Sequence, residues 1–331
     1  MKPIIRSLAT CLCAPALLLA AGSASALTLN LGHTLAPESH YQVMAEKLGE
    51  LIEQKSAGEI TINTFPQSQL GGEVKMIQSA RSGTLDMFVT AQAPLTSTVK
   101  AFSFFDVPYL FDSVDQANTA LAGPLGKHFL EMLPDYNLVG LGWLSAMERN
   151  VFASKPVDSE RGMHGLKLRV MQSPGYVRTY EALGAQPTPM AYGELYIALQ
   201  QGVIDGGDTS PDQFVMDKFT EVSKFYSITR VHYLPGLLIM SKRRWDSLND
   251  QQKGWLQEAA DEALAYGIEY YKRSYDESIE RMQAGGVTVV ETDVAPLREK
   301  SAKVREQLIE QVPEGRKLLE LLETSTQAAP Q

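Results

Sequence analysis

A long helical stripe of apolar side chains near the C-terminus constrains the fold more than any other feature of the sequence. From Asn249 to Ala284, apolar residues recur at steps of three and four, which places them on one face of an α-helix. At 1.5 Å per residue, about 35 residues give a rod of roughly 50 Å, and Gly285-Gly286 ends it. The steps do not keep a clean heptad, so a coiled-coil dimer is the less favoured alternative. We expect a helix that lies across two domains. The stripe consists of Leu256, Ala260, Leu264, Ile268, Tyr271, Tyr275, Ile279 and Met282.

Strand-like and helix-like patterns alternate along the rest of the chain. This alternation predicts α/β domains with mainly parallel sheets, whose ligands bind at the carboxyl ends of the strands. A chain of 331 residues also favours two domains over one. We predict lobe I from residues 27–150 and about 239–270, lobe II from 151–238 and about 271–325, and a disordered tail at 326–331. Strands are predicted at 27–33, 59–65, 84–90, 137–145, 165–171, 202–210 and 287–293, and helices at 41–56, 72–83, 175–184 and 192–202, with a last helix after residue 293.

The first 26 residues have the pattern of a Sec-type secretory signal peptide. Lys2 and Arg6 precede an apolar stretch, and small residues at 24–26 form a cleavage site. Both cysteines, Cys11 and Cys13, lie in this segment. A lipid anchor on Cys11 is the weaker alternative, because the apolar stretch continues past it. We therefore expect a mature chain that begins near Leu27, lacks thiol chemistry and is exported to the periplasm.

Charge and motif content exclude several classes of function. Without Lys2 and Arg6 the chain has 28 basic and 39 acidic residues, a formal charge of −11, and no basic tract. We therefore expect no binding to nucleic acid. The sequence contains no nucleophile elbow, phosphate loop or zinc-protease motif, and its five histidines lack metal-ligand spacing. We predict a protein that is not an enzyme and binds neither a metal nor a cofactor.

Two arginines at the ends of predicted strands point to an acidic ligand. Arg149 follows strand 137–145, and Arg169 lies near the end of strand 165–171. A guanidinium group matches a carboxylate with two parallel hydrogen bonds, each contributing about 1.5–3 kcal/mol. The alternative is structural: Arg149 could pair with Glu148 or Asp158, and Arg169 with an internal aspartate. The sequence pattern alone leaves both interpretations open.

Five blocks of sequence resemble the solute-binding proteins of TRAP transporters (tripartite ATP-independent periplasmic transporters). The resemblance covers essentially the whole chain after residue 26, and the order and spacing of the blocks are specific. It implies a two-lobed α/β periplasmic binding protein, type II-like, with a long helix spanning both domains. Such a protein closes over one small organic acid and delivers it to the permease subunits in the membrane. The blocks are FPQSQLGGEVKMIQSARSGTLDM, FDVPYLFDSVDQA, GLKLRVMQSP, EALGAQPTPMAYGELYIALQQGVIDG and MSKRRWDSLNDQQK.

The resemblance also implies roles for individual residues. Arg169 occupies the position of the arginine that grips the substrate carboxylate, and Arg149 that of a second arginine found in many sugar-acid binders. Glu73 would line the cleft and accept hydrogen bonds from the ligand, although it could instead face solvent at the start of its helix. His33 and Gln92 follow predicted strands at positions where the family also places pocket residues.

The chain departs from the family pattern after GVIDG. The family usually has a Glu-Asn pair there, whose asparagine helps to hold the ligand carboxylate, and this chain has Asp208 and Thr209. Threonine lacks the second donor of an amide, and an aspartate facing the cleft would repel a second carboxylate. We therefore favour a sugar acid or a short hydroxy monocarboxylate over a C4-dicarboxylate. A sensory ligand-binding protein or an enzyme on the same scaffold remains an alternative, and we expect a monomer. Tyr192, which begins a helical pattern, either supports that helix or reaches the cleft.

Overall fold

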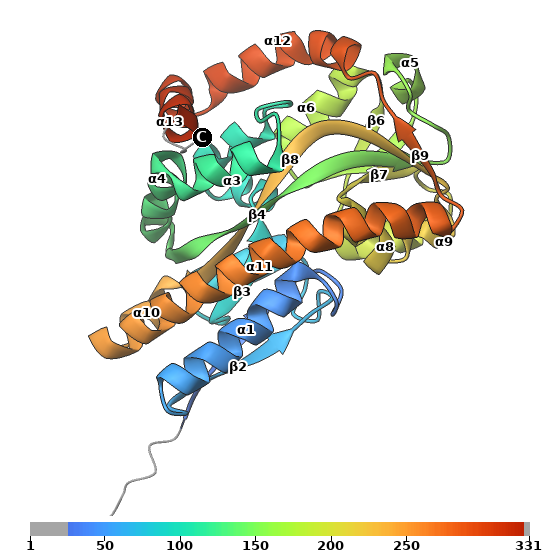
Figure 1. The fold of residues 1–331 in the computed structure, drawn as a ribbon. Helices are drawn as coiled ribbons and strands as arrows, with labels where there is room; N and C mark the ends of the chain where they lie inside the picture. The colour runs from blue at the N-terminus through green and yellow to red at the C-terminus, as the bar shows by residue number, and fades with distance from the viewer. Residues whose placement is uncertain (1–25, 328–331) are drawn as a thin grey trace, which may run out of the picture.

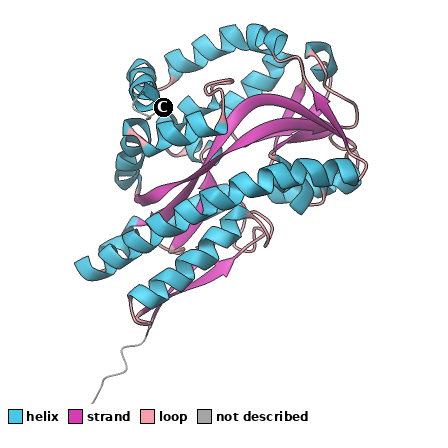
Figure 2. Ribbon diagram, viewed as in Figure 1, coloured by secondary structure: helices cyan, strands magenta, loops and turns pink. Residues whose placement is uncertain are grey.

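One mixed β-sheet runs through both ends of the molecule in the computed structural model, which describes residues 26–327 (Figures 1 and 2). The predicted signal peptide and residues 328–331 of the predicted tail lie outside the described residues, apart from Ala26. The strand order is β2-β1-β3-β8-β4-β7-β5-β6, with β9 paired to β8. The strands are β1 (Leu27–Gly32), β2 (Ile60–Phe65), β3 (Met87–Ala91), β4 (Leu138–Ala153), β5 (Lys167–Val170), β6 (Gln186–Pro189), β7 (Gly206–Thr209), β8 (Phe225–Ser241) and β9 (Thr288–Glu291).

Parallel strands form the two ends of this sheet, and two long antiparallel strands join them. β1 pairs in parallel with β2 and β3, and β5 pairs in parallel with β6 and β7. β4 and β8 run antiparallel to each other between these ends. The periodicity predicted only the first part of β4 and did not predict β8. The reason is physical: β8 is buried along nearly its whole length, so it lacks the alternation that marks a half-exposed strand.

Helices cover the sheet on both sides (Figure 1). Four of the predicted helices, at 41–56, 72–83, 175–184 and 249–284, begin and end within one residue of the predicted boundaries. Serine or asparagine caps and glycines mark several of these ends. Ser39, for example, accepts a hydrogen bond from the backbone of Gln42 at the start of α1, and Gly83 ends α2 in the left-handed region. The α-helices are α1 (His40–Lys55), α2 (Glu73–Ser82), α3 (Val114–Ala122), α4 (Pro124–Met132), α5 (Glu160–Met163), α6 (Pro174–Leu183), α7 (Leu195–Gln200), α8 (Pro211–Met216), α9 (Phe219–Val222), α10 (Lys242–Asp246), α11 (Asp250–Ala284), α12 (Ala295–Gln311) and α13 (Gly315–Gln327). Short 3-10 helices are η1 (Ala93–Ser97), η2 (Lys100–Asp106), η3 (Leu133–Tyr136) and η4 (Tyr192–Glu194).

The predicted long helix is present as α11, with 35 residues. Asn249 caps it in a capping box with Gln252. Along its length α11 contacts α1, β4, α8 and β9, so it lies against elements from both ends of the sheet (Figure 1). The apolar stripe faces these elements: its residues are buried or packed against the main hydrophobic core.

The C-terminal helix differs from the predicted division of the chain. We predicted residues 271–325 in lobe II, but α13 packs against α3 and α4, which lie in the segment predicted as lobe I. Leu318 of α13 belongs to the same hydrophobic cluster as Phe102, Phe129 and Trp143. Helix α13 also continues to Gln327, past the predicted start of the tail. The apolar face of α13 packs against buried residues of α3 and α4. The sequence pattern did not indicate this packing.

Candidate ligand-binding site

Arg169 has a buried guanidinium group without a carboxylate partner. It lies one residue before the end of β5, and only 1% of its surface is exposed. Nε and Nη2 donate to the backbone oxygen of Met190 at 3.1 and 3.0 Å, and Nη1 lies 3.4 Å from Met171 Sδ. The Tyr192 ring centroid lies 5.5 Å from the guanidinium carbon. Within residues 26–327, Arg169 forms no ion pair, so the alternative of an internal aspartate partner is wrong.

Arg149, by contrast, forms an ion pair with a carboxylate of the protein. Its Nε donates to Asp208 Oδ2 at 2.9 Å, and its Nη2 donates to the backbone oxygen of Asp208. Nη1 lies 3.4 Å from Thr209 Oγ1 and 3.5 Å from Gln213 Oε1. The register explains this pairing, because β4 and β7 are neighbours and Asn150 lies opposite Thr209. The ion-pair partner of Arg149 is therefore Asp208, and not Glu148 or Asp158 as the structural alternative had it.

The pKa values of the two arginines are shifted in opposite directions. Burial disfavours the charge on Arg149, but the attraction and hydrogen bond of Asp208 outweigh it and raise the pKa of the guanidinium. Burial also opposes ionisation of Asp208, yet Arg149, followed by Arg169, lowers the pKa of this carboxyl group. For Arg169, burial and the like charge of Arg149 lower the pKa. A buried cation without an anionic partner is costly, and an incoming carboxylate would relieve that cost.

A small cavity lined by Arg149, but not by Arg169 itself, lies between the ends of the sheet. Its volume is about 20 Å³, which is close to the space that one water molecule occupies. Met171 and Tyr192, which contact Arg169, belong to its wall, as does Arg149 itself. The wall combines residues of both predicted lobes: Thr34, Leu35, Tyr41, Glu73, Ala91, Met147, Arg149, Met171, Tyr192, Gln213 and Leu234.

Glu73 lines this cavity from the first residue of α2. Its Oε1 accepts hydrogen bonds from the Ala91 backbone N–H at 2.9 Å and from Thr90 Oγ1 at 3.2 Å. Burial raises the pKa of the Glu73 carboxyl group, against the effects of the Ala91 hydrogen bond and the Arg169 charge. The alternative in which Glu73 faces solvent is therefore wrong, since only 7% of the residue is exposed.

His33, Gln92 and Thr209 are buried near the cavity but do not line it. His33 Nε2 lies 2.8 Å from Gln42 Oε1, and burial lowers the pKa of this imidazole to about 4. Gln92 Nε2 donates to Asp106 Oδ1 at 3.3 Å. The neighbouring residues Thr34 and Ala91 form the wall instead. A one-residue shift along an extended segment turns a side chain to the other face, and the sequence pattern could not fix that choice.

Three polar residues of the wall, Thr34, Tyr41 and Gln213, were not predicted from the sequence. Tyr41 lies in the first turn of α1, and its buried hydroxyl has no hydrogen-bond partner among the described residues. Gln213 lies in α8 and contacts both Thr209 and Arg149. In the sequence, Tyr41 reads as one more apolar position of an amphipathic helix. No local signal distinguished Gln213 either, because its role depends on where α8 meets β4.

The buried carboxyl group of Asp106 makes the free energy of unfolding depend on pH. Its carboxyl group accepts hydrogen bonds from Ser173 and Gln92, and burial raises its pKa from 3.8 to about 7. Between pH 4 and 7 the folded protein holds a proton that the unfolded chain has released, so this group lowers the free energy of unfolding as pH rises. We expect Asp106→Asn to remove that dependence, because its amide is neutral at every pH.

The experiment is urea denaturation of wild type and Asp106→Asn at pH 5 and pH 8. From pH 5 to pH 8, we expect the free energy of unfolding of wild type to fall by about 2–3 kcal/mol relative to that of Asp106→Asn. His33 and His232, whose pKa values burial lowers to about 4, have the opposite pH dependence but are common to both proteins. A difference that stays constant between the two pH values would contradict the assignment.

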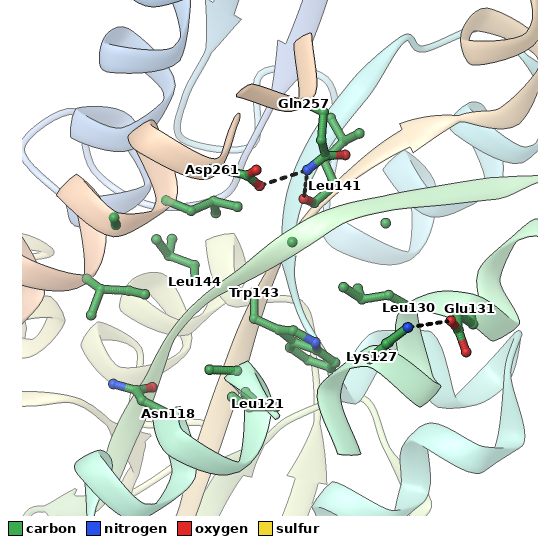
Figure 3. Close-up of a pocket in the computed structure, with 16 residues that line it drawn as sticks. Asn118, Leu121, Lys127, Leu130, Glu131, Leu141, Trp143, Leu144, Gln257 and Asp261 are labelled. Atoms are coloured by element: carbon green, nitrogen blue, oxygen red, sulfur yellow. Dashed lines mark hydrogen bonds and ion pairs between the residues drawn. The ribbon is translucent and has the colours of Figure 1, made fainter. Parts of the chain in front are cut away.

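A larger hollow lies elsewhere and lacks the chemistry for an acid. It is an open groove of about 750 Å³ between α3, α4, β4 and α11. Figure 3 shows Gln257 reaching Leu141 and Asp261, and Lys127 beside Glu131. Lys127 is the one basic residue of its wall and pairs with Glu131 at 3.7 Å. Most of the remaining wall is apolar, so the arginine cavity is the better candidate for an anionic ligand.

Residues 26–327 contain no group of three or more His, Cys, Asp or Glu side chains arranged to hold a metal ion. Over the same residues, no helix is both long and apolar enough to cross a bilayer.

Two sheet ends are joined by long strands and a spanning helix, and Arg169, which contacts the wall of the cavity between them, has no ion-pair partner within residues 26–327. These features define an α/β receptor for an anionic solute. A family model for bacterial extracellular solute-binding protein family 7 (DctP) matches residues 31–311. The chain therefore belongs to this family, the solute-binding proteins of TRAP transporters. Both the predicted family and the two-lobed fold class are confirmed.

Similar proteins include receptors with known solutes. The 2,3-diketo-L-gulonate-binding periplasmic protein YiaO of Escherichia coli is 30% identical over 305 residues, which are 91% of this chain and 93% of that protein. The sugar acid binding protein DctPAm of Advenella mimigardefordensis, solved with galactonate, has a TM-score of 0.89 at 27% identity over 92% of this chain and 99% of its own. A TRAP solute-binding protein of Polaromonas, bound to D-erythronate, has a TM-score of 0.87 at 30% identity, covering 92% and 100%. The predicted receptor for a small organic acid is consistent with all three.

Proposed function

We propose that this chain is a periplasmic receptor that captures a sugar acid or a related hydroxy monocarboxylate and delivers it to a TRAP permease. The observation that carries the proposal is the contrast between the two arginines. Arg149 has Asp208 as a partner, whereas Arg169 has only a backbone carbonyl and a thioether among the described residues. Arg169 is therefore the anchor for the carboxylate of the ligand. The solutes bound by the three similar proteins support the same chemical class.

The charges around the cavity favour one carboxylate rather than two. Asp208 neutralises Arg149, and Glu73 adds an acidic group to the wall. A second carboxylate on a C4-dicarboxylate would have to lie near one of these acids without a free cation. Hydroxyl groups have no such penalty, and they can donate to Glu73 or bind the hydroxyl of Tyr41, which lacks a protein partner.

Binding requires the two lobes, or the side chains between them, to move apart. A cavity of about 20 Å³ cannot hold a sugar acid. The ligand would contact residues of both lobes only after they close around it, so binding would shift an open population toward a closed one.

Isothermal titration of the chain from Leu27 onward tests the ligand class. The panel is galactonate, D-erythronate, 2,3-diketo-L-gulonate and succinate. We expect at least one sugar acid to bind at least tenfold more tightly than succinate, because the second carboxylate of succinate would lack a cationic partner. Tighter binding of succinate would favour the C4-dicarboxylate alternative instead.

The non-enzymatic role needs its own measurement. We expect the bound acid to be recovered unchanged, by NMR, after prolonged incubation with the protein, since a receptor releases what it binds. Conversion of the acid would favour an enzyme on this scaffold. Co-purification with a membrane kinase in place of permease subunits would favour the sensory alternative.

A further inference from the structure

Gln213 lines the cavity, and the two N–H donors of its side-chain amide have only one weak acceptor among the described residues. Only 2% of the residue is exposed. Its Oε1 accepts a hydrogen bond from Thr209 Oγ1 at 2.9 Å and lies 3.5 Å from Arg149 Nη1. Its Nε2 has one acceptor within residues 26–327, the sulfur of Met147 at 2.8 Å. A primary amide nitrogen carries two N–H donors, and a thioether is a weak acceptor.

Gln213 lines the small cavity, and Arg169 contacts two other residues of its wall. The connection runs through the wall residues Met171 and Tyr192, both of which contact Arg169. The Thr209 hydroxyl binds the oxygen end of the Gln213 amide, which leaves the nitrogen end with the sulfur. Under-used amide donors on this cavity, whose wall also contacts the Arg169 guanidinium, match a carboxylate best, because charge-assisted hydrogen bonds are the stronger ones.

We propose that Gln213 completes the carboxylate clamp of this receptor. Its Nε2 donates to the ligand carboxylate that Arg169 anchors, and Thr209 acts as a positioning residue that fixes the orientation of the amide. The inference rests on the proposed function and assigns the amide contact to a residue on α8 rather than to the end of β7. The threonine that stands in place of an asparagine at position 209 thus orients an amide four residues later.

Calorimetric titration with galactonate, D-erythronate and 2,3-diketo-L-gulonate tests this assignment. Gln213→Met keeps the volume of the side chain and removes its donors, so we expect the Kd of the best acid to rise roughly tenfold to a hundredfold. Gln213→Glu replaces the amide by a carboxylate facing the negative ligand, and we expect a larger loss. Gln251→Ala, an exposed glutamine on α11, is the matched control and should bind like wild type.

A rescue variant separates ligand contact from a structural role. Thr209→Asn in the Gln213→Met background returns an amide to the site, and we expect it to recover at least threefold of the lost affinity. Thermal unfolding of each ligand-free variant should give a midpoint close to that of wild type. Loss of binding that follows loss of stability, without rescue, would overturn the role of Gln213.

The outcomes also distinguish this inference from the function on which it rests. If Arg169→Ala loses binding while Gln213→Met and Gln213→Glu bind like wild type, the clamp assignment is wrong and the receptor proposal stands. If Arg169→Ala binds like wild type, or if none of the three acids binds the wild-type protein, both proposals are overturned.

Discussion

Replacing Arg169 by alanine will weaken the binding of the best sugar acid by roughly a hundredfold or more. A guanidinium group forms two parallel charge-assisted hydrogen bonds with a carboxylate, each contributing about 1.5–3 kcal/mol, and about 1.4 kcal/mol corresponds to a factor of ten in Kd. The two bonds that Arg169 now donates to the Met190 carbonyl oxygen offset part of this gain if the ligand displaces them. The expected loss is therefore near the lower end of the range.

Arg169→Lys is the informative companion variant. It keeps a positive charge but loses the planar pair of donors, so we expect an affinity between those of wild type and Arg169→Ala. Titration calorimetry gives all three values, and thermal unfolding checks that the ligand-free proteins are folded. Equal affinities for wild type and Arg169→Ala would refute the anchor.

Removing the carboxylate of Asp208 will destabilise the fold itself. In Asp208→Ala, Arg149 would remain buried without its counter-ion, and breaking a buried pair in this way costs about 3–5 kcal/mol. Both side chains are 1% exposed and are joined at 2.9 Å, so water cannot replace the missing partner. Urea denaturation at pH 7 measures the loss of unfolding free energy.

A surface pair provides the matched control for this change. Lys242 and Asp246 lie 2.6 Å apart in α10, with side chains 37% and 54% exposed, and an exposed pair of this kind contributes at most about 1 kcal/mol. We therefore expect Asp246→Ala to have little effect. A loss for Asp208→Ala no larger than that for Asp246→Ala would contradict the importance of the buried pair.

The pH dependence has a definite sign for the buried pair. Arg149 and Arg169 lower the pKa of Asp208 below 3.8 in the folded protein. Its contribution to stability is therefore complete above the pKa of the unfolded chain and is lost as pH falls through the folded value. The gap in stability between wild type and Asp208→Ala should accordingly narrow below about pH 4.

The sequence was sufficient to predict the family, the long helix and the place of Arg169 near the end of a strand. The apolar stripe from Leu256 to Met282 keeps a helical periodicity over many turns, so it is a specific signal for a helix. Arg169 stands at the end of a short alternating strand, where a charged residue needs a reason. Both signals depend on residues that are close together in the sequence, so they can be recognised without knowing the tertiary contacts.

The roles of Asp208 and Gln213 depend on contacts between residues that are far apart in the chain. Asp208 meets Arg149 only because β7 pairs with β4, and nothing near Arg149 in the sequence indicates that pairing. Gln213 becomes a wall residue because α8 directly follows β7 and packs against α11. Burial on both faces likewise removed from β8 the alternation by which strands are recognised.

The path of the chain through the sheet determines how the protein can fold. β3, which completes the N-terminal end of the sheet, pairs with β8, so that Met87 lies opposite Met240. Contacts between residues so distant in sequence form slowly, because a long loop must close first. The N-terminal end of the sheet therefore cannot be completed while the chain is being synthesised up to β7. The other end likewise depends on an earlier part of the chain, because β7 pairs with β4.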